Sequence, residues 1–108
     1  MFKDKIVAIT GGSDGIGKAL IDEFIKRGAK IATCGRSQDK LYNLQVQYSS
    51  KLLHTVVADV SNENDCKRFI ESTIETFGGI DILINNAGVS MRALVADTDL
   101  ATIRKVMD

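Results

Sequence analysis

A glycine-rich turn between an apolar run and an amphipathic segment constrains this chain more than any other stretch. The apolar run covers residues 6–9, and the turn reads Thr10-Gly-Gly-Ser-Asp-Gly-Ile-Gly17. A strand that passes directly into a helix aims the first N–H groups of the helix at one point, where the helix dipole favours an anion. Glycines at 11, 15 and 17 permit a tight turn, close phosphate approach and close helix–strand contact. The turn predicts a nucleotide cofactor site.

The same turn has two competing interpretations. The stretch from Gly12 to Lys18 has the Gly-x-x-x-x-Gly-Lys spacing of a phosphate loop, but Ala19 stands where that loop needs a hydroxyl to hold Mg²⁺. The missing ligand disfavours a nucleotide hydrolase. The other interpretation is a structural turn with no ligand, since the spacing also differs from the common Gly-x-Gly-x-x-Gly fingerprint.

Apolar runs alternate with helical patterns along the chain. Strands are predicted at residues 5–10, 30–34, 53–58 and 82–84, and helices at 15–27, 37–48, 61–77 and 99–108. Ser37 and Ser61 are the predicted N-caps, and Gly28 and Gly78 end the helices before them. The third strand is continuous and apolar, which is typical of a strand covered on both faces.

This alternation with right-handed crossovers predicts an α/β fold, a Rossmann-type doubly wound parallel sheet in the order 3-2-1-4. Residues 1–108 would form one small domain, with strand four left as a bare edge. We expect the chain to be a truncated part of a larger domain, because its last helix has no cap before Asp108.

Charge and composition exclude several partners. Lys plus Arg equals Asp plus Glu at 14 each, which gives no reason to expect nucleic acid or an anionic membrane. No apolar run approaches the roughly 20 residues that span a bilayer, and the first strand leaves no room for a signal peptide, so a cytoplasmic location is expected. Cys34, Cys66 and the single His54 form no metal-ligand motif, and we interpret them as structural.

Polar or glycine-rich residues follow every predicted strand. They are residues 10–17, 35–37, 59–60 and 85–88. Ligands of such sheets bind outside the carboxyl ends of the strands, where the strand order reverses. The sequence therefore predicts one crevice, between strands one and four, into which these segments converge.

Together these segments resemble the N-terminal half of the short-chain dehydrogenase/reductase family. The matching motifs are Thr10–Gly17 in the first turn, the pair Asp59-Val60, and Asn85-Asn-Ala-Gly88 after Ile80-Asp-Ile-Leu-Ile84. The resemblance covers essentially the whole chain. It implies an NAD(P)-dependent oxidoreductase that moves hydride between a nicotinamide cofactor and a small-molecule carbonyl or alcohol.

The resemblance also implies residue roles. Residues lining the pyrophosphate and the adjoining ribose would be Gly11, Gly15, Ile16 and Gly17, with Ser13 close to phosphate and Asp14 in the same turn. Asp59 would accept a hydrogen bond from the adenine amino group, with Val60 beside the ring. Asn86, Ala87 and Gly88 would approach the cofactor ribose, although Asn and Gly also form turns without any ligand.

The end of the second strand bears on the choice of cofactor. An NAD site places a carboxylate there for the ribose 2′-hydroxyl, whereas this chain has Gly35, Arg36 and Ser37. Arg36 can pair with a 2′-phosphate, and Ser37 can donate a further hydrogen bond. NADP is therefore expected over NAD. Asp14, an anion in the glycine turn, counts against this expectation, and the alternative for Arg36 is a solvated surface charge.

No catalytic residue is predicted within these residues. The family's chemistry needs Tyr-x-x-x-Lys, but Val46 stands four residues after Tyr42 and Leu52 four after Tyr48. We therefore expect the 108 residues alone to be inactive. Two alternatives stay open, a non-catalytic NAD(P)-binding sensor and an association module. The resemblance further implies a homo-oligomer, either a dimer or a tetramer.

Overall fold

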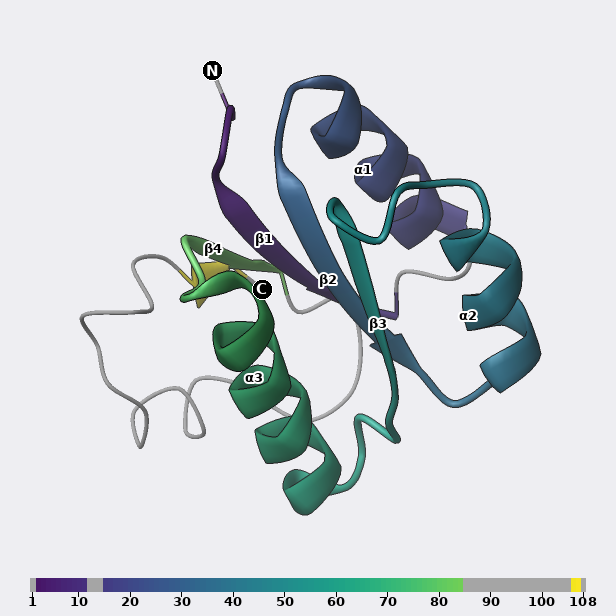
Figure 1. Ribbon diagram of the computed structural model, residues 1–108. Coiled ribbons are helices and arrows are strands. Elements are labelled where there is room, and N and C mark those ends of the chain that lie inside the picture. Colours follow the sequence, from purple (N-terminus) through teal and green to yellow (C-terminus); the bar gives the residue numbers. More distant parts are fainter. Residues whose placement is uncertain (1, 12–14, 85–105, 108) are drawn as a thin grey trace.

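A parallel sheet with helices on both faces forms the framework (Figure 1). The computed structural model describes residues 2–11, 15–84 and 106–107. In chain order the elements are β1 (Ile6–Thr10), α1 (Gly15–Lys26), β2 (Lys30–Gly35), α2 (Gln38–Gln45), β3 (Leu53–Val57), α3 (Glu63–Phe77), β4 (Ile82–Ile84) and β5 (Val106–Met107). The sheet order is β3-β2-β1-β4-β5, so the predicted order 3-2-1-4 is confirmed.

Side chains of the central strands alternate between two core layers. On one face, Val7 and Ile9 of β1 share a buried cluster with Ile21 of α1 and Leu44 of α2. On the other face, Ala8 joins the cluster of α3. That cluster also holds Ala32, Cys34, Cys66, Phe69, Ile70 and Leu83. Because alternate residues of a strand face opposite sides, the near-continuous apolar strands supply both layers.

The helix ends follow local hydrogen bonding. Ser37 is the N-cap of α2, as predicted, and its Oγ accepts from the Lys40 backbone N at 3.3 Å. The predicted cap Ser61 of α3 is wrong, because Asn62 takes that place and its Oδ1 accepts from the Asp65 N at 3.0 Å. Ser61 instead bonds the Asp59 carboxylate.

Two expectations about the sheet margins are wrong. Val106 and Met107 form β5 beside β4 rather than the end of a helix, and β4 is therefore not a bare edge. An open edge carries unpaired backbone N–H and C=O groups, which an extended segment satisfies. At the other margin, the expectation that β3 is covered on both faces is wrong. β3 is half-buried over most of its length and Val57 is exposed, because β3 is the outermost strand. The predicted helical residues 99–105 lie outside the described ranges.

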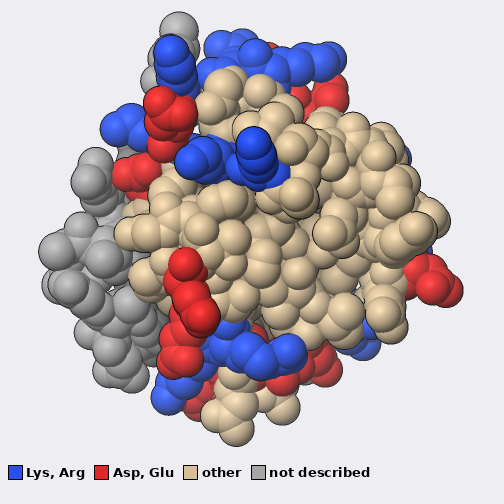
Figure 2. Space-filling view, in the orientation of Figure 1, with Lys and Arg blue, Asp and Glu red and all other residues tan. Residues whose placement is uncertain are grey.

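On the face shown in Figure 2, positive and negative side chains lie next to one another towards the top and the bottom, with uncharged residues across the middle. No helix in the described part of the chain combines the length and the apolar character needed to cross a bilayer.

Candidate functional site

The carboxyl ends of β1, β2 and β3 lie at the same edge of the sheet and are joined by backbone hydrogen bonds. Thr10 pairs with Cys34, and Gly35 pairs with Val57. Past the end of β1, the Gly11 N donates to the Cys34 O at 3.0 Å, and past the end of β3 the Ala58 N donates to the Gly35 O at 2.8 Å. The segments that follow the three strands therefore start side by side.

The turn after β1 uses glycine where the backbone requires it. Gly11 has φ 69° and Gly15 has φ 51°, a region that side-chain-bearing residues rarely adopt. A Cβ on Gly15 would meet nothing within 4 Å, so conformation and not space calls for glycine there. Gly17 is buried. Within α1, which has 12 residues, the first turn holds no acidic residue. The N-terminal end of such a helix carries partial positive charge and favours an anion.

A cationic residue and a helix N-terminus follow β2. Arg36 is exposed, and Ser37 is half-buried at the start of α2. As the N-cap, the Ser37 hydroxyl uses a lone pair to accept from Lys40, which leaves its proton able to serve another acceptor. No carboxylate occurs among residues 35–37. The cation and the hydroxyl that follow β2 suit a negatively charged group.

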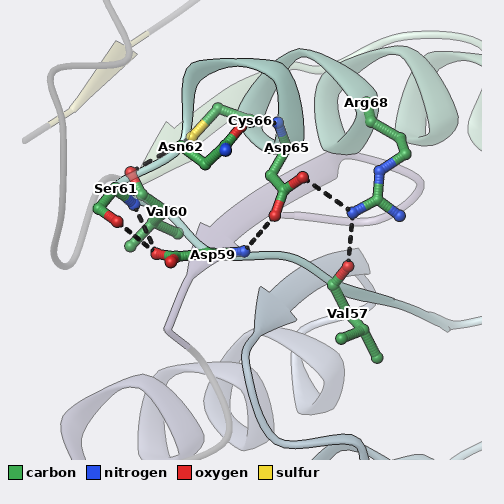
Figure 3. Close-up of polar contacts among 8 residues, drawn as sticks. All are labelled: Val57, Asp59, Val60, Ser61, Asn62, Asp65, Cys66 and Arg68. Atoms are coloured by element: carbon green, nitrogen blue, oxygen red, sulfur yellow. Dashed lines mark hydrogen bonds and ion pairs between the residues drawn. The ribbon is translucent and has the colours of Figure 1, made fainter.

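The turn after β3 holds an ionised carboxylate (Figure 3). Oδ1 of Asp59 accepts from the Ser61 Oγ at 2.6 Å and from the Ser61 N at 2.9 Å. These two hydrogen bonds, with the nearby positive charge of Arg36, hold the pKa of Asp59 below its usual value. Among the described residues none bonds Oδ2 of Asp59. The carboxylate is fixed by one oxygen.

Side chains of α3 hold the same turn from the other side (Figure 3). Oδ2 of Asp65 accepts from the Asp59 N at 2.8 Å, and the Nη2 of Arg68 donates to the Val57 O at 2.8 Å. The Cys66 thiol donates to the Val60 O at 3.4 Å. Neither Asp65 nor Arg68 is among the predicted site residues. Their opposite charges, three residues apart, predict an ion pair along a helix. The sequence gives no sign that both side chains also bond to the backbone at the end of β3 and in the turn after it.

The predicted site residues fall into two groups. Those that the structure brings to one edge of the sheet are Gly11, Arg36, Ser37, Asp59 and Val60, with Gly15 and Gly17 at the start of α1. Outside the described ranges lie Ser13, Asp14, Asn86, Ala87 and Gly88, and the side chain of Ile16. β4 ends at Ile84, which pairs with Ile9, so its carboxyl end lies beside that of β1.

Two buried thiols lie behind this edge. Cys34 is almost fully buried near the end of β2, and burial raises the pKa of its thiol to about 12. Burial also raises the pKa of Cys66 at the start of α3. Both cysteines are free. The described residues contain no group of three His, Cys, Asp or Glu side chains able to hold a metal ion.

Known proteins are similar to this chain in sequence and in fold. A protein from Arabidopsis thaliana, 11-beta-hydroxysteroid dehydrogenase-like 2, is 42% identical over 108 residues, which cover 96% of this chain and 35% of that protein. The 3-ketoacyl-(acyl-carrier-protein) reductase from Brucella melitensis, solved with NADH, is 31% identical with a TM-score of 0.77 over 82% of this chain and 36% of its own. The C-domain of a bacterial malonyl-CoA reductase, solved with NADP, is 31% identical with a TM-score of 0.76 over 82% of this chain and 15% of its own.

The chain therefore spans about a third of the length of the curated relative from Arabidopsis thaliana. The family model for short chain dehydrogenases matches residues 5–108. A match of this extent, on a chain whose strand order and glycine turn already suit a dinucleotide, means that the chain belongs to the short-chain dehydrogenase family.

Proposed function

We propose that this chain is the cofactor-binding part of an NAD(P)-dependent oxidoreductase acting on a carbonyl or alcohol. The observation that carries the proposal is the meeting of three strand ends at one edge of the sheet. A positive-φ glycine turn with a helix N-terminus follows β1, the Arg36 cation follows β2, and the Asp59 carboxylate follows β3. The glycine turn with the helix N-terminus suits a pyrophosphate, the Arg36 cation suits a ribose phosphate, and the Asp59 carboxylate suits an adenine amino group.

Several of the predicted site residues have a proposed task in holding the cofactor. Gly11 and the first turn of α1 would hold the pyrophosphate, with Ser13, Asp14 and Ile16 in the same segment. Asp59, already held through Oδ1, would accept from the adenine amino group through Oδ2, with Val60 beside the ring. Residues 86–88 would approach the ribose from the end of β4. When bound, the nicotinamide cofactor supplies or accepts the hydride.

The proton-transfer pair that the family uses is not among these 108 residues, which contain no Tyr-x-x-x-Lys. We therefore propose that residues 1–108 bind the cofactor as part of one domain and perform no hydride transfer by themselves. By the same family membership, we propose a homo-oligomer. We also propose the cytoplasmic location that the sequence predicts. Measuring the intact mass of the protein expressed from its own reading frame separates this proposal from a cofactor-binding sensor or association module. An enzyme requires a mass well above 11.8 kDa and Tyr-x-x-x-Lys in the added sequence.

We propose NADP as the preferred cofactor. Support comes from the exposed guanidinium of Arg36 beside the Ser37 hydroxyl and the N-terminus of α2, without a carboxylate among residues 35–37. A 2′-phosphate placed there would gain charge-assisted hydrogen bonds from Arg36 and Ser37. The one acidic residue of α2 is Asp39, in its first turn. Of the two similar solved structures, the 3-ketoacyl-(acyl-carrier-protein) reductase contains NADH and the malonyl-CoA reductase domain contains NADP.

Replacing Arg36 by Ala should affect the binding of NADPH more than the binding of NADH. Calorimetric titration of the expressed protein should give a lower Kd for NADPH than for NADH. The variant should bind NADPH about 10- to 100-fold more weakly, because a charge-assisted hydrogen bond is lost, and NADH less than about threefold more weakly. Arg27→Ala, an exposed arginine at the far end of α1, is the matched control and should change neither value.

Three outcomes would contradict the proposal in different parts. Tighter binding of NADH than NADPH, or equal weakening of both by Arg36→Ala, would overturn the NADP preference alone. Failure of the expressed protein to bind either dinucleotide would overturn the cofactor-binding function itself.

A further inference from the structure

The turn that bears Asp59 has a backbone N–H that the sheet does not satisfy. The last sheet bond of this segment runs from the Ala58 N to the Gly35 O. Successive N–H groups of a strand point to opposite sides, so the N–H of Asp59 points away from β2. β3 is the outermost strand on that side and offers no further neighbour. The acceptor must therefore come from outside the sheet.

Asp65 supplies that acceptor from the first turn of α3. Its Oδ2 lies 2.8 Å from the Asp59 N, a length typical of a strong hydrogen bond to a carboxylate. The backbone N of Asp65 is itself held by the Asn62 side chain, so the carboxylate projects from a capped and ordered turn. Asp65 fixes the main chain of Asp59 relative to α3.

Arg68 orients Asp65. Its Nη2 lies 3.4 Å from the Asp65 Oδ1 and donates to the Val57 O at 2.8 Å. The ion pair is half-exposed and by itself contributes little stability. Its geometric effect is larger, since one guanidinium group joins the end of β3 to the carboxylate that holds the next turn. Ser61 then fixes the Asp59 carboxylate within this turn.

We propose that Asp65 is a positioning residue for the adenine end of the cofactor. It holds the main chain of Asp59 and so sets the direction of the Asp59 carboxylate, without touching the ligand. Arg68 assists by holding Asp65. This inference rests on the proposed cofactor-binding function. It predicts that ligands containing adenine depend on Asp65, whereas a ligand without adenine does not.

The test measures dissociation constants of NADPH, ADP-ribose and reduced nicotinamide mononucleotide on the expressed protein. Asp65→Ala should weaken NADPH and ADP-ribose about tenfold, the effect of one well-placed hydrogen bond, and leave the mononucleotide within about twofold. Asp65→Asn keeps an oxygen acceptor for the Asp59 N and should restore adenine-dependent affinity to within about threefold. Glu71→Ala, an exposed carboxylate on the same helix, is the matched control and should change nothing.

Contradictory outcomes separate this inference from the function beneath it. If the wild-type protein binds NADPH but Asp65→Ala binds all three ligands like wild type, or loses all three equally, the positioning role is overturned while the function stands. If the wild-type protein binds no dinucleotide, the proposed function falls first. Should Asp65→Ala fail to fold, Arg68→Ala gives the same test, with a smaller, adenine-selective weakening expected and an unselective one overturning the inference.

Discussion

At the scale of single residues, the two thiols lie within a few residues of the polar turns and yet belong to the core. Cys34 precedes Gly35 and Arg36 directly, but its side chain faces α3 in a cluster with Ala8 and Phe69. Burial disfavours the thiolate, which is the reactive form of cysteine. Because side chains alternate in direction along a strand, Cys34 points into the core although the cationic Arg36 follows it by only two residues.

The thiols are therefore predicted to be unreactive in the folded protein. At pH 8, a thiol with a pKa of about 12 is almost wholly protonated, so a disulfide reagent should modify Cys34 at least about a hundredfold more slowly than in urea. Absorbance of the released thiolate follows the reaction. Cys66→Ala isolates Cys34, and Cys34→Ala isolates Cys66. A fast phase from Cys34 in the native protein would contradict the burial argument.

At the scale of elements, two glycines end helices in the same backbone conformation but in different surroundings. Gly28 follows α1 with φ 94°, and Gly78 follows α3 with φ 91°. A Cβ on Gly28 would lie 3.1 Å from the Cα of Lys3, whereas a Cβ on Gly78 would meet nothing within 4 Å. The Gly28 O also accepts from the Asp4 N at 3.0 Å, which holds the N-terminal segment against this turn.

This difference predicts unequal costs for the same substitution. Gly78→Ala should lower the free energy of unfolding by about 1 kcal/mol, the conformational penalty of a left-handed residue. Gly28→Ala should cost about 1 kcal/mol more, because backbone atoms of Lys3 must shift as well. Urea unfolding followed by circular dichroism measures both. Equal losses in the two variants would show that the contact with Lys3 yields without cost.

The turn between β3 and α3 shows how far sequence predicts an element boundary. Asp59 was recognisable by its place after a strand, and the start of α3 by a run of capping residues. Asn62 is the cap and Ser61 is not, because the Ser61 hydroxyl donates to the Asp59 carboxylate while the Asn62 side chain accepts from the Asp65 N. Asp65 and Arg68 bond to the backbone of Asp59 and Val57, which the fold brings next to α3. The spacing of Asp65 and Arg68 along the helix does not reveal these contacts with another element.

At the scale of the whole molecule, the order of four strands was predictable because two local signals agree. Short apolar runs alternating with helical patterns require a parallel sheet, and right-handed crossovers leave few strand orders. The sheet margins were less predictable. β3 was predicted to be an apolar strand covered on both faces, but it contains His54 and Thr55, and at its outer position both are half-buried. β5 forms where the local pattern indicates a helix, because pairing with β4 depends on the sheet and not on residues 106–107 themselves.

His54 joins β3 to α3 and makes the stability of the molecule sensitive to pH. Its Nε2 lies 2.7 Å from the Ser72 Oγ, and its ring meets the Phe77 ring edge-on at 6.2 Å between centroids. The Lys30 ammonium lies over the same Phe77 ring. Burial lowers the pKa of His54, so the folded protein favours the neutral imidazole. The unfolded chain, with a histidine pKa of about 6.5, binds the proton more readily.

The sign of the pH effect follows from this proton linkage. The stability contributed by neutral His54 is fully present above about pH 6.5 and is lost as the pH falls from there towards the lowered pKa of the folded state. Urea unfolding at pH 7.5 and 5.5 should show a larger loss for wild type than for His54→Gln, which titrates at neither pH. Carboxylates act in both proteins, and His54 is the only histidine, so the difference belongs to this side chain. If the free energy of unfolding fell by the same amount in both proteins, the imidazole of His54 would accept a proton as readily in the folded protein as in the unfolded chain.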